Sequence, residues 1–196
     1  VEAGIDIIND GEQGRPDYTA HVLRRLSGFH GKSTTPLGTG DAEFPELAEL
    51  LKPFASPFQY RPACTGPVDW TDWPAAQADI DLAKNAVKGA RAEDCFMTSP
   101  SPGQIARYLK NDYFPTEEAY IFRLAEVMRR EYKAIVDAGF ILQLDCPDLA
   151  MLRHMVYLDL PLVEYRKIIA VNVAALNHAV QDLPPDRMRM HVCWGS

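Results

Sequence analysis

The chain has 196 residues, of which 47% are hydrophobic and 24% charged, and this composition predicts one globular domain with a sizeable core. A formal net charge of −7 argues against non-specific nucleic-acid binding, and no apolar run is long enough to span a bilayer. We therefore expect the protein to bind neither nucleic acid nor a membrane. The four cysteines are widely spaced and form no CxxC motif, which indicates reduced thiols in a cytoplasmic protein.

Short apolar runs alternate along the chain with longer segments of helical spacing. The helix expected at 116–138 is the clearest, because Thr116 can cap its first turn and Gly139 can end it. Further helices are predicted at 44–51, 74–90 and 161–181, with helical turns between residues 15 and 26. Runs of aliphatic and aromatic residues predict strands at 5–9, 58–64, 94–98, 140–144 and 188–192.

Strands separated by helices long enough for crossover connections predict a parallel α/β sheet. Each predicted strand is followed by a polar, Gly- or Pro-containing segment, such as "NDGEQGR" or "TSPSPGQ". This pattern is typical of a (β/α)8 TIM barrel, whose active site lies at the carboxyl ends of the strands. A doubly wound sheet would show the same alternation, although no GxGxxG motif follows the first strand. Five strands cannot close an eight-stranded barrel, so we expect residues 1–196 to form a single, partial barrel domain.

The segment "MRMHVCWGS" places His191 and Cys193 two residues apart at the end of an apolar run. Residues i and i+2 of a strand point to the same face, so imidazole and thiol are expected to project side by side. Such a pair suits zinc. A buried cysteine beside a hydrogen-bonded histidine is the alternative, because cysteine is among the residues most often buried.

Two carboxylates also follow predicted strands. Asp145 ends the apolar run "FILQL", and Glu12 follows the first strand after "INDG". Local ion pairs or helix caps would explain each of them alone. If both lie at one barrel mouth, however, they form a negative pocket that suits an ammonium group.

Together these strand-end motifs resemble the catalytic C-terminal barrel of cobalamin-independent methionine synthase. "GIDIINDGEQGR" is similar to that family's second-strand segment, "ILQLDCPDLA" to its fifth and "MRMHVCWGS" to its sixth. "CFMTSPSPG" occupies the place of a Thr-Gly-Pro turn after the fourth strand, which makes Thr98 and Ser99 candidates for a loop on the side of the methyl donor. The resemblance implies strands two to six of the barrel, with the first, seventh and eighth strands absent from the chain.

The resemblance also implies a chemistry. It assigns His191 and Cys193 as zinc ligands, with the remaining ligands expected beyond Ser196, and Glu12 and Asp145 as the residues that hold the amine of homocysteine. The implied reaction is a methyltransferase reaction, in which the zinc-activated thiol of homocysteine takes the methyl group of a methyltetrahydrofolate-type donor to give methionine.

Two alternatives stay open at this point. One is a related zinc-dependent alkyl transfer, such as epoxyalkane:coenzyme M transfer or methyl transfer from a corrinoid. The other is a barrel-derived binding protein without catalytic activity. The sequence leaves the oligomeric state unknown.

Overall fold

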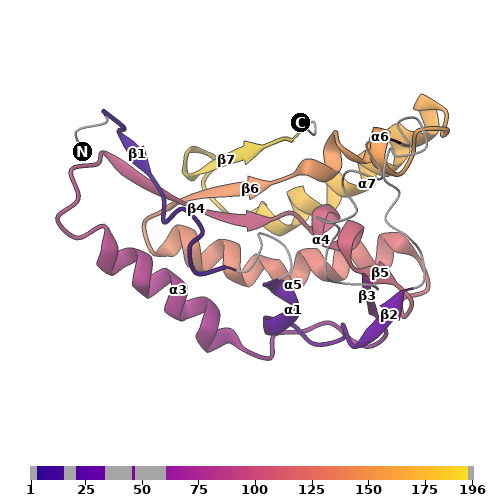
Figure 1. Ribbon diagram of the computed structural model, residues 1–196, viewed down its shortest axis with the longest axis horizontal. Coiled ribbons are helices and arrows are strands. Elements are labelled where there is room, and N and C mark those ends of the chain that lie inside the picture. Colours follow the sequence, from indigo (N-terminus) through magenta and orange to yellow (C-terminus); the bar gives the residue numbers. More distant parts are fainter. Residues whose placement is uncertain (1–3, 16–20, 34–45, 47–60, 194–196) are drawn as a thin grey trace.

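The computed structural model describes residues 4–15, 21–33, 46 and 61–193. Its main sheet has four strands in the order β1-β4-β6-β7 (Figure 1), and each neighbouring pair is parallel. The strands are β1 (Ile7–Ile8), β4 (Asp94–Pro100), β6 (Ile141–Asp145) and β7 (Met188–His191). The predicted parallel α/β sheet is therefore confirmed.

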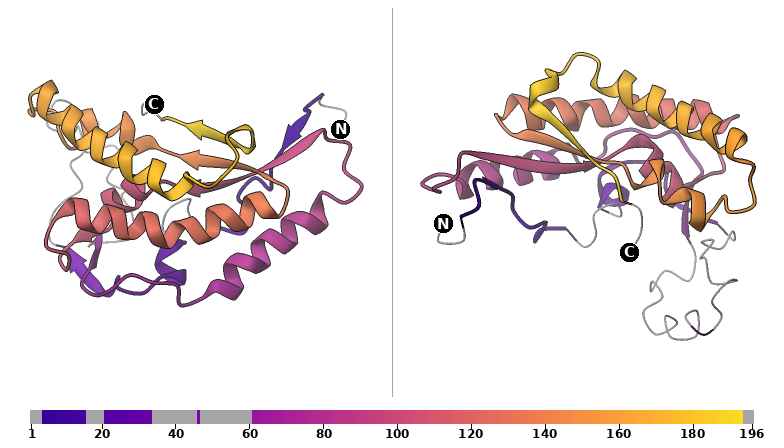
Figure 2. Two further views of the ribbon diagram at one scale, coloured as in Figure 1. Left: turned by 180° about the vertical axis from the view of Figure 1, so that it is seen from behind. Right: turned by 90° about the horizontal axis from the view of Figure 1, so that it is seen from above.

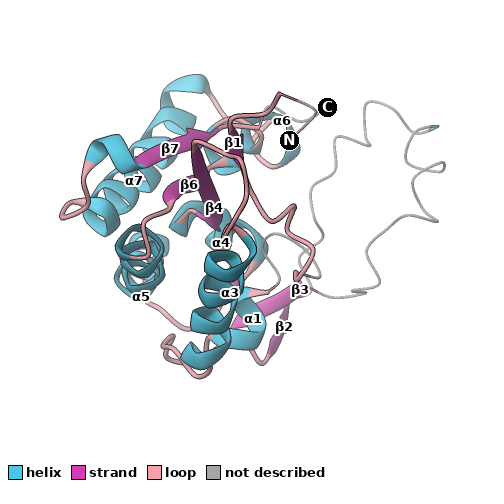
Figure 3. Ribbon diagram, turned by 90° about the vertical axis from the view of Figure 1, so that its left-hand side faces the viewer, coloured by secondary structure: helices cyan, strands magenta, loops and turns pink. Residues whose placement is uncertain are grey.

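Long helices cover one face of this sheet. Helix α5 (Glu117–Asp137) packs on β4 and β6 and lies beside α7 (Leu162–Val180), as Figures 2 and 3 show. Helix α3 (Trp73–Ala86) contacts α5 from the other side. The shorter helical segments are α1 (Val22–Arg25), α4 (Pro102–Tyr108), α6 (Leu152–Met155) and the 3-10 turns Pro147–Leu149 and Pro185–Arg187.

The alternation of side chains along the strands separates core from site. Cys95, Met97 and Ser99 of β4 are buried on the face that meets the helices, and so are Leu142 and Leu144 of β6. Since successive strand residues point to opposite faces, the residues between them lie on the face away from α5 and α7. That second face carries Phe96 and Thr98 from β4, Gln143 and Asp145 from β6, and Arg189 and His191 from β7.

Several predicted elements match the structure closely. Thr116 caps α5, its hydroxyl accepting a hydrogen bond from the Ala119 amide at 3.1 Å, and Gly139 follows the helix with φ of 93°. Helix α3 is also capped at its start, by Asp72. The helix predicted at 44–51 lies, apart from residue 46, outside the described residues.

The strand predicted at 58–64 does not join the main sheet. Its described part, β3 (Arg61–Cys64), lies in a second sheet between antiparallel β2 (Gly31–Ser33) and parallel β5 (Lys110–Asn111). The cause is local pairing: the Thr65 amide donates to the Gly28 carbonyl at 2.8 Å, and the Ser27 amide donates to the Asp69 carbonyl at 2.8 Å. In the main sheet, β1 pairs directly with β4 instead.

The main sheet is open within the described residues, with β1 at one edge and β7 at the other. Closure into a barrel therefore stays a prediction. None of the described helices is long and apolar enough to cross a membrane.

Candidate functional site

A pocket of about 280 Å³ lies at the carboxyl ends of β6 and β7, and all four residues expected to bind substrate or metal line it. We call it the carboxylate pocket, and its lining consists of Glu12, Gln143, Asp145, Pro147, His191 and Cys193. Glu12 comes from the segment after β1, so residues far apart in the sequence meet in one place. The carboxyl end of a parallel sheet is where α/β folds bind ligands.

The register of β6 and β7 brings the carboxylate and the imidazole together. Asp145 pairs with His191 across the parallel strands, and the Cys146 amide donates to the His191 carbonyl at 2.8 Å. Gln143 and Arg189 are the preceding pair on the same face. Cys193 lies two residues past His191 and lines the same pocket, as the spacing predicts. His191 is exposed and Cys193 half-buried, which leaves both accessible from the pocket.

Glu12 is held by a threonine and an arginine. The Thr98 hydroxyl donates to Glu12 Oε1 at 2.5 Å and accepts from Arg15 Nη1 at 2.9 Å. Arg15 Nη1 also donates to the Thr98 carbonyl at 3.0 Å. Glu12 itself has φ of 56°, a left-handed backbone conformation that is uncommon for a residue other than glycine. A tight turn with charged hydrogen bonds therefore directs this carboxylate towards the end of β6.

Asp145 is the most buried acid of the pocket, with 5% of its surface exposed. Burial raises the pKa of its carboxyl group, and the nearby Glu12 carboxylate raises it further. A hydrogen bond from Gln143 Nε2 to Asp145 Oδ1, 3.0 Å long, acts in the opposite direction by stabilising the ionised form. Two acids that repel each other in a partly dry pocket create a demand for a cation.

Thr98 and Ser99, which the resemblance makes candidates for a donor-side loop, both lie within strand β4, because this strand continues past the predicted end at Thr98 to Pro100. Their side chains diverge, as neighbouring strand residues must. Thr98 binds Glu12, whereas the Ser99 hydroxyl donates to Glu131 Oε2 of α5 at 3.2 Å on the core side. Ser99 is fully buried there and does not line the carboxylate pocket.

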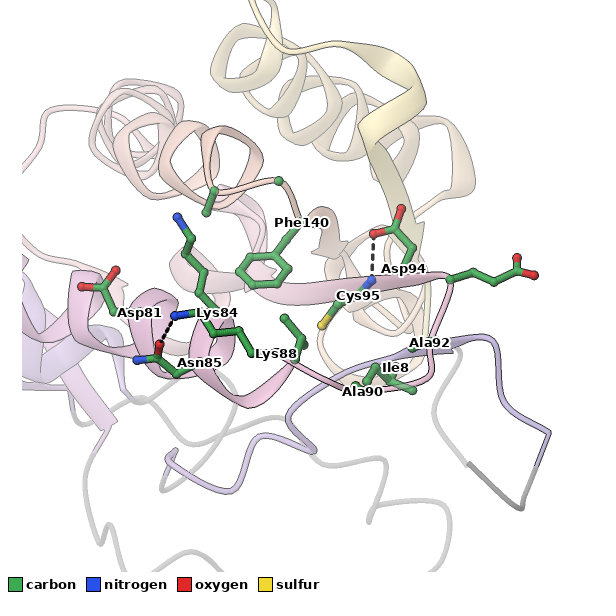
Figure 4. A pocket seen from close by; sticks show the side chains of 14 residues that line it. Ile8, Asp81, Lys84, Asn85, Lys88, Ala90, Ala92, Asp94, Cys95 and Phe140 are labelled. Atoms are coloured by element: carbon green, nitrogen blue, oxygen red, sulfur yellow. Dashed lines mark hydrogen bonds between the residues drawn. The ribbon is translucent and has the colours of Figure 1, made fainter.

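A larger hollow of about 630 Å³ lies near the amino ends of the strands, between α3 and the start of β4. Figure 4 shows Lys84 and Lys88 on its α3 side, with Cys95 and Phe140 across from them. Lys88 Nζ donates to Asn85 Oδ1 at 2.8 Å, so one of the two ammonium groups is already bound within the chain. This end of a parallel sheet seldom holds catalytic groups. We therefore take the smaller carboxylate pocket as the candidate site.

Sequence reasoning missed two residues that support the pocket, namely Gln143 and Arg189. Each makes a hydrogen bond that fixes a neighbour, and both lie within a strand rather than after it. The spacing of two between Gln143 and Asp145, and between Arg189 and His191, would have placed them on the same face as the candidate residues. Arg15 flanks Glu12 in the sequence as a candidate ion-pair partner, and in the structure its side chain donates to Thr98.

His191 and Cys193 provide nitrogen and sulfur donors of the kind that zinc takes in proteins. Among the described residues, no group of three or more His, Cys, Asp or Glu side chains is arranged to hold a metal ion. The described part of the chain thus contributes a pair of candidate ligands and no larger set.

Comparison with curated proteins finds methionine synthases along almost the whole chain. The chain is 29% identical to methionine synthase of Pyrococcus furiosus and 27% identical to that of Thermococcus kodakarensis, in each case over 99% of this chain and 48% of the relative. It is 24% identical to methionine synthase of Sulfolobus acidocaldarius over 99% of this chain. The chain is similar to methionine synthases, as its motifs predict. It spans about half the length of these relatives.

The fold agrees with this similarity. A B12-independent methionine synthase from Shewanella sp. W3-18-1, solved in complex with selenomethionine, superposes with a TM-score of 0.69 at 22% identity. The match covers 99% of this chain and 48% of that one. No family model matches the chain.

Proposed function

We propose that the chain forms part of a zinc-dependent methyltransferase of the methionine synthase type, with the carboxylate pocket as its amino-acid site. The observation that carries this proposal is the convergence of Glu12, Asp145, His191 and Cys193 on one pocket. The similarity to methionine synthases supports the same reading. The product, methionine, carries an ammonium group and a thioether sulfur, and the pocket offers two acids for the first and the His191–Cys193 pair for the second.

The two acids would bind the α-ammonium group of homocysteine. Asp145 is buried and Glu12 half-buried. Burial first, and the Glu12 charge second, raise the Asp145 pKa, and a bound cation would offset both by stabilising the ionised carboxylates. Thr98 and Arg15 fix the position of the Glu12 carboxylate before the ligand arrives, which lowers the ordering cost of binding. An acceptor that carries a sulfonate instead of an ammonium group would be repelled, which disfavours coenzyme M.

The thiol end of the acceptor would lie near His191 and Cys193. These residues fit zinc by the chemistry of their donor atoms and by their shared place on the pocket wall. They would supply two ligands, and the others would come from outside the described residues. When bound, zinc lowers the pKa of a coordinated thiol so that the nucleophilic thiolate is present at neutral pH. His191 and Cys193 would thereby hold the acceptor sulfur at a fixed distance from the acids that bind its amine.

The reaction that we propose moves a methyl group from N5 of a methyltetrahydrofolate-type donor to the homocysteine sulfur. The C–N bond of the donor breaks as the C–S bond forms. The acceptor thiol gives up one proton and N5 of the donor takes up one, which yields methionine and the demethylated donor. The protein's contribution is to orient the acceptor, because alignment of two reactants removes much of the entropic barrier. We further propose that the site belongs to a TIM barrel. We also propose a cytoplasmic location, which is consistent with the buried free thiols of Cys64, Cys95 and Cys146.

Zinc content tests the metal half of the proposal. Wild-type protein, Cys193→Ser and His191→Asn are purified without chelator, and zinc per chain is determined by mass spectrometry. We expect both variants to lose most of the metal, because removal of one ligand weakens a zinc site strongly. Cys95→Ala is the matched control, since its buried thiol lies at the start of β4 and not in the carboxylate pocket. Zinc content unchanged in Cys193→Ser would refute the assignment.

Turnover tests the acceptor. Methyl transfer is compared with homocysteine and with coenzyme M, in wild type and in Glu12→Gln. We expect transfer to homocysteine only, and a raised KM for homocysteine in the variant with a smaller change in kcat. Transfer to coenzyme M that is unaffected by Glu12→Gln would favour the alternative alkyl transfer, and absence of turnover with zinc bound would favour a binding protein.

A further inference from the structure

Asp145, the acid at the end of β6, is held by a row of interacting side chains that runs across β4, β6 and β7. Gln143 Nε2 donates to Asp145 Oδ1 at 3.0 Å, and Gln143 Oε1 accepts from Arg189 Nε at 2.8 Å. The Arg189 guanidinium in turn lies over the Phe96 ring, 3.5 Å from its centroid. All four side chains lie on the sheet face away from α5 and α7, because their strand registers match.

This arrangement determines which way the Gln143 amide points. An amide group has one donating and one accepting end, and Arg189 can only donate. With the carbonyl oxygen engaged by Arg189, the amide nitrogen must face Asp145. The cation–π contact with Phe96 holds the guanidinium over the ring and so limits the positions that the donor can take.

The consequence for Asp145 is a carboxylate with one oxygen occupied and the other available. Oδ1 accepts the Gln143 amide, whereas no hydrogen bond from a described residue is assigned to Oδ2. Asp145 and Gln143 both line the carboxylate pocket, whereas Arg189 and Phe96 do not. This row of interacting side chains therefore begins outside the carboxylate pocket and ends at Asp145 inside it.

We propose that Gln143, oriented by Arg189, is a positioning residue that directs the free oxygen of Asp145 at the ammonium group of the amino-acid ligand and so sets the preference for amino acids. This inference rests on the proposed function, because it assumes that Asp145 receives an α-ammonium group. It goes beyond that function by assigning the selectivity to two residues that bear no acidic group. Phe96 serves as the platform on which Arg189 is held.

The test is a preference ratio determined by isothermal titration calorimetry. Methionine is compared with its analogue in which a hydroxyl group replaces the α-amino group, so that shape is kept and the cation is removed. Any loss of folded protein lowers the binding-competent fraction equally for both ligands and leaves the ratio of their affinities unchanged. A change of the ratio therefore reports positioning at the ammonium site and not a general structural defect.

Three variants define the outcome. Gln143→Met keeps the length of the side chain and removes both hydrogen bonds, and we expect the preference for methionine to fall about tenfold. Arg189→Lys keeps the charge but removes the planar donor that fixes the amide, and we expect a fall of about threefold. Arg187→Lys is the matched control, because Arg187 binds Asp94 and the Gly139 carbonyl and does not contact Gln143; its ratio should equal that of wild type.

The outcomes distinguish a failure of the proposed amino-acid site from a failure of the roles of Gln143 and Arg189. Equal affinity of wild-type protein for the two ligands would refute the amine site and the inference with it. A clear preference in wild type that persists in Gln143→Met would refute the role of Gln143 and leave the proposed function standing. A preference lost in Gln143→Met but unchanged in Arg189→Lys would refute the orienting role of Arg189.

Discussion

Replacement of Thr98 by valine should both destabilise the protein and release Glu12. Thr98 has 5% of its surface exposed, and valine has nearly its shape, so the change removes the hydroxyl without opening a cavity. The variant loses the 2.5 Å hydrogen bond to Glu12 Oε1 and the 2.9 Å bond from Arg15 Nη1. Arg15 keeps its bond to the Thr98 carbonyl. Thr98→Ser, which retains a hydroxyl group, is the control.

The magnitude follows from the two bonds. Each involves a charged partner, and such a bond contributes about 1.5–3 kcal/mol when it is well buried. Glu12 and Arg15 are only half-buried, so we discount the sum to about 2 kcal/mol. For a chain of this size that corresponds to a fall in Tm of about 4–8 °C.

Urea unfolding followed by circular dichroism gives the free energy of unfolding directly. Methionine titration of the folded variant gives the effect on Glu12. We expect weaker methionine binding in Thr98→Val, with Thr98→Ser near wild type in both assays. If Thr98→Val unfolds within about 0.5 kcal/mol of wild type and binds methionine equally well, the hydroxyl does not hold Glu12 and this part of the account is wrong.

Two further changes test the packing between α4 and α7 and the charge within the carboxylate pocket. In Gly103→Ala the added methyl would overlap Asp148 Oδ2 and lie 2.6 Å from Asn172 Nδ2, so we expect a loss of about 3 kcal/mol in urea unfolding. Gly14→Ala, where nothing lies within 4 Å, should show no loss, and a stable Gly103→Ala would contradict the described contact. Burial raises the pKa of Asp145, so the stability that its carboxyl group contributes is full below the unfolded pKa and lost as pH rises through the folded one. Asp145→Asn should therefore be more stable than wild type at about pH 7.5, with a smaller difference at about pH 4.5, and should bind methionine more weakly; an equal difference at both values would refute the pKa shift.

Much of the site could be predicted because strand periodicity and strand ends are local properties. The spacing of His191 and Cys193 placed both on one face, and the apolar run before Asp145 located its carboxylate at a strand end. The structure brings both together with Glu12 at one pocket. The registers that align Asp145 with His191 depend on contacts between distant segments, and the sequence pattern only suggested them.

The predictions that were wrong or incomplete also depend on contacts between distant segments of the chain. The segment at 61–64 has a strand composition, but its pairing with β2 and β5 is decided by tertiary contacts near Gly28 and Asp69, which no periodicity reveals. The motif resemblance predicts a loop that contains Ser99, whereas β4 continues to Pro100 and directs the Ser99 side chain to Glu131 on the opposite face from Thr98. Supporting residues such as Arg189 could not be recognised, because their role depends on a hydrogen-bond geometry that only the fold creates.

The binding preference of Glu12→Gln decides whether the carboxylate pocket is an amino-acid site. Methionine and its α-hydroxy analogue are titrated into wild-type protein, Glu12→Gln and the control Glu118→Gln, whose side chain is exposed at the start of α5. We predict that wild type and Glu118→Gln prefer methionine by at least about tenfold and that Glu12→Gln loses most of this preference. Equal binding of both ligands by wild type, or an undiminished preference in Glu12→Gln, would contradict the assignment of the carboxylate pocket as an amino-acid site.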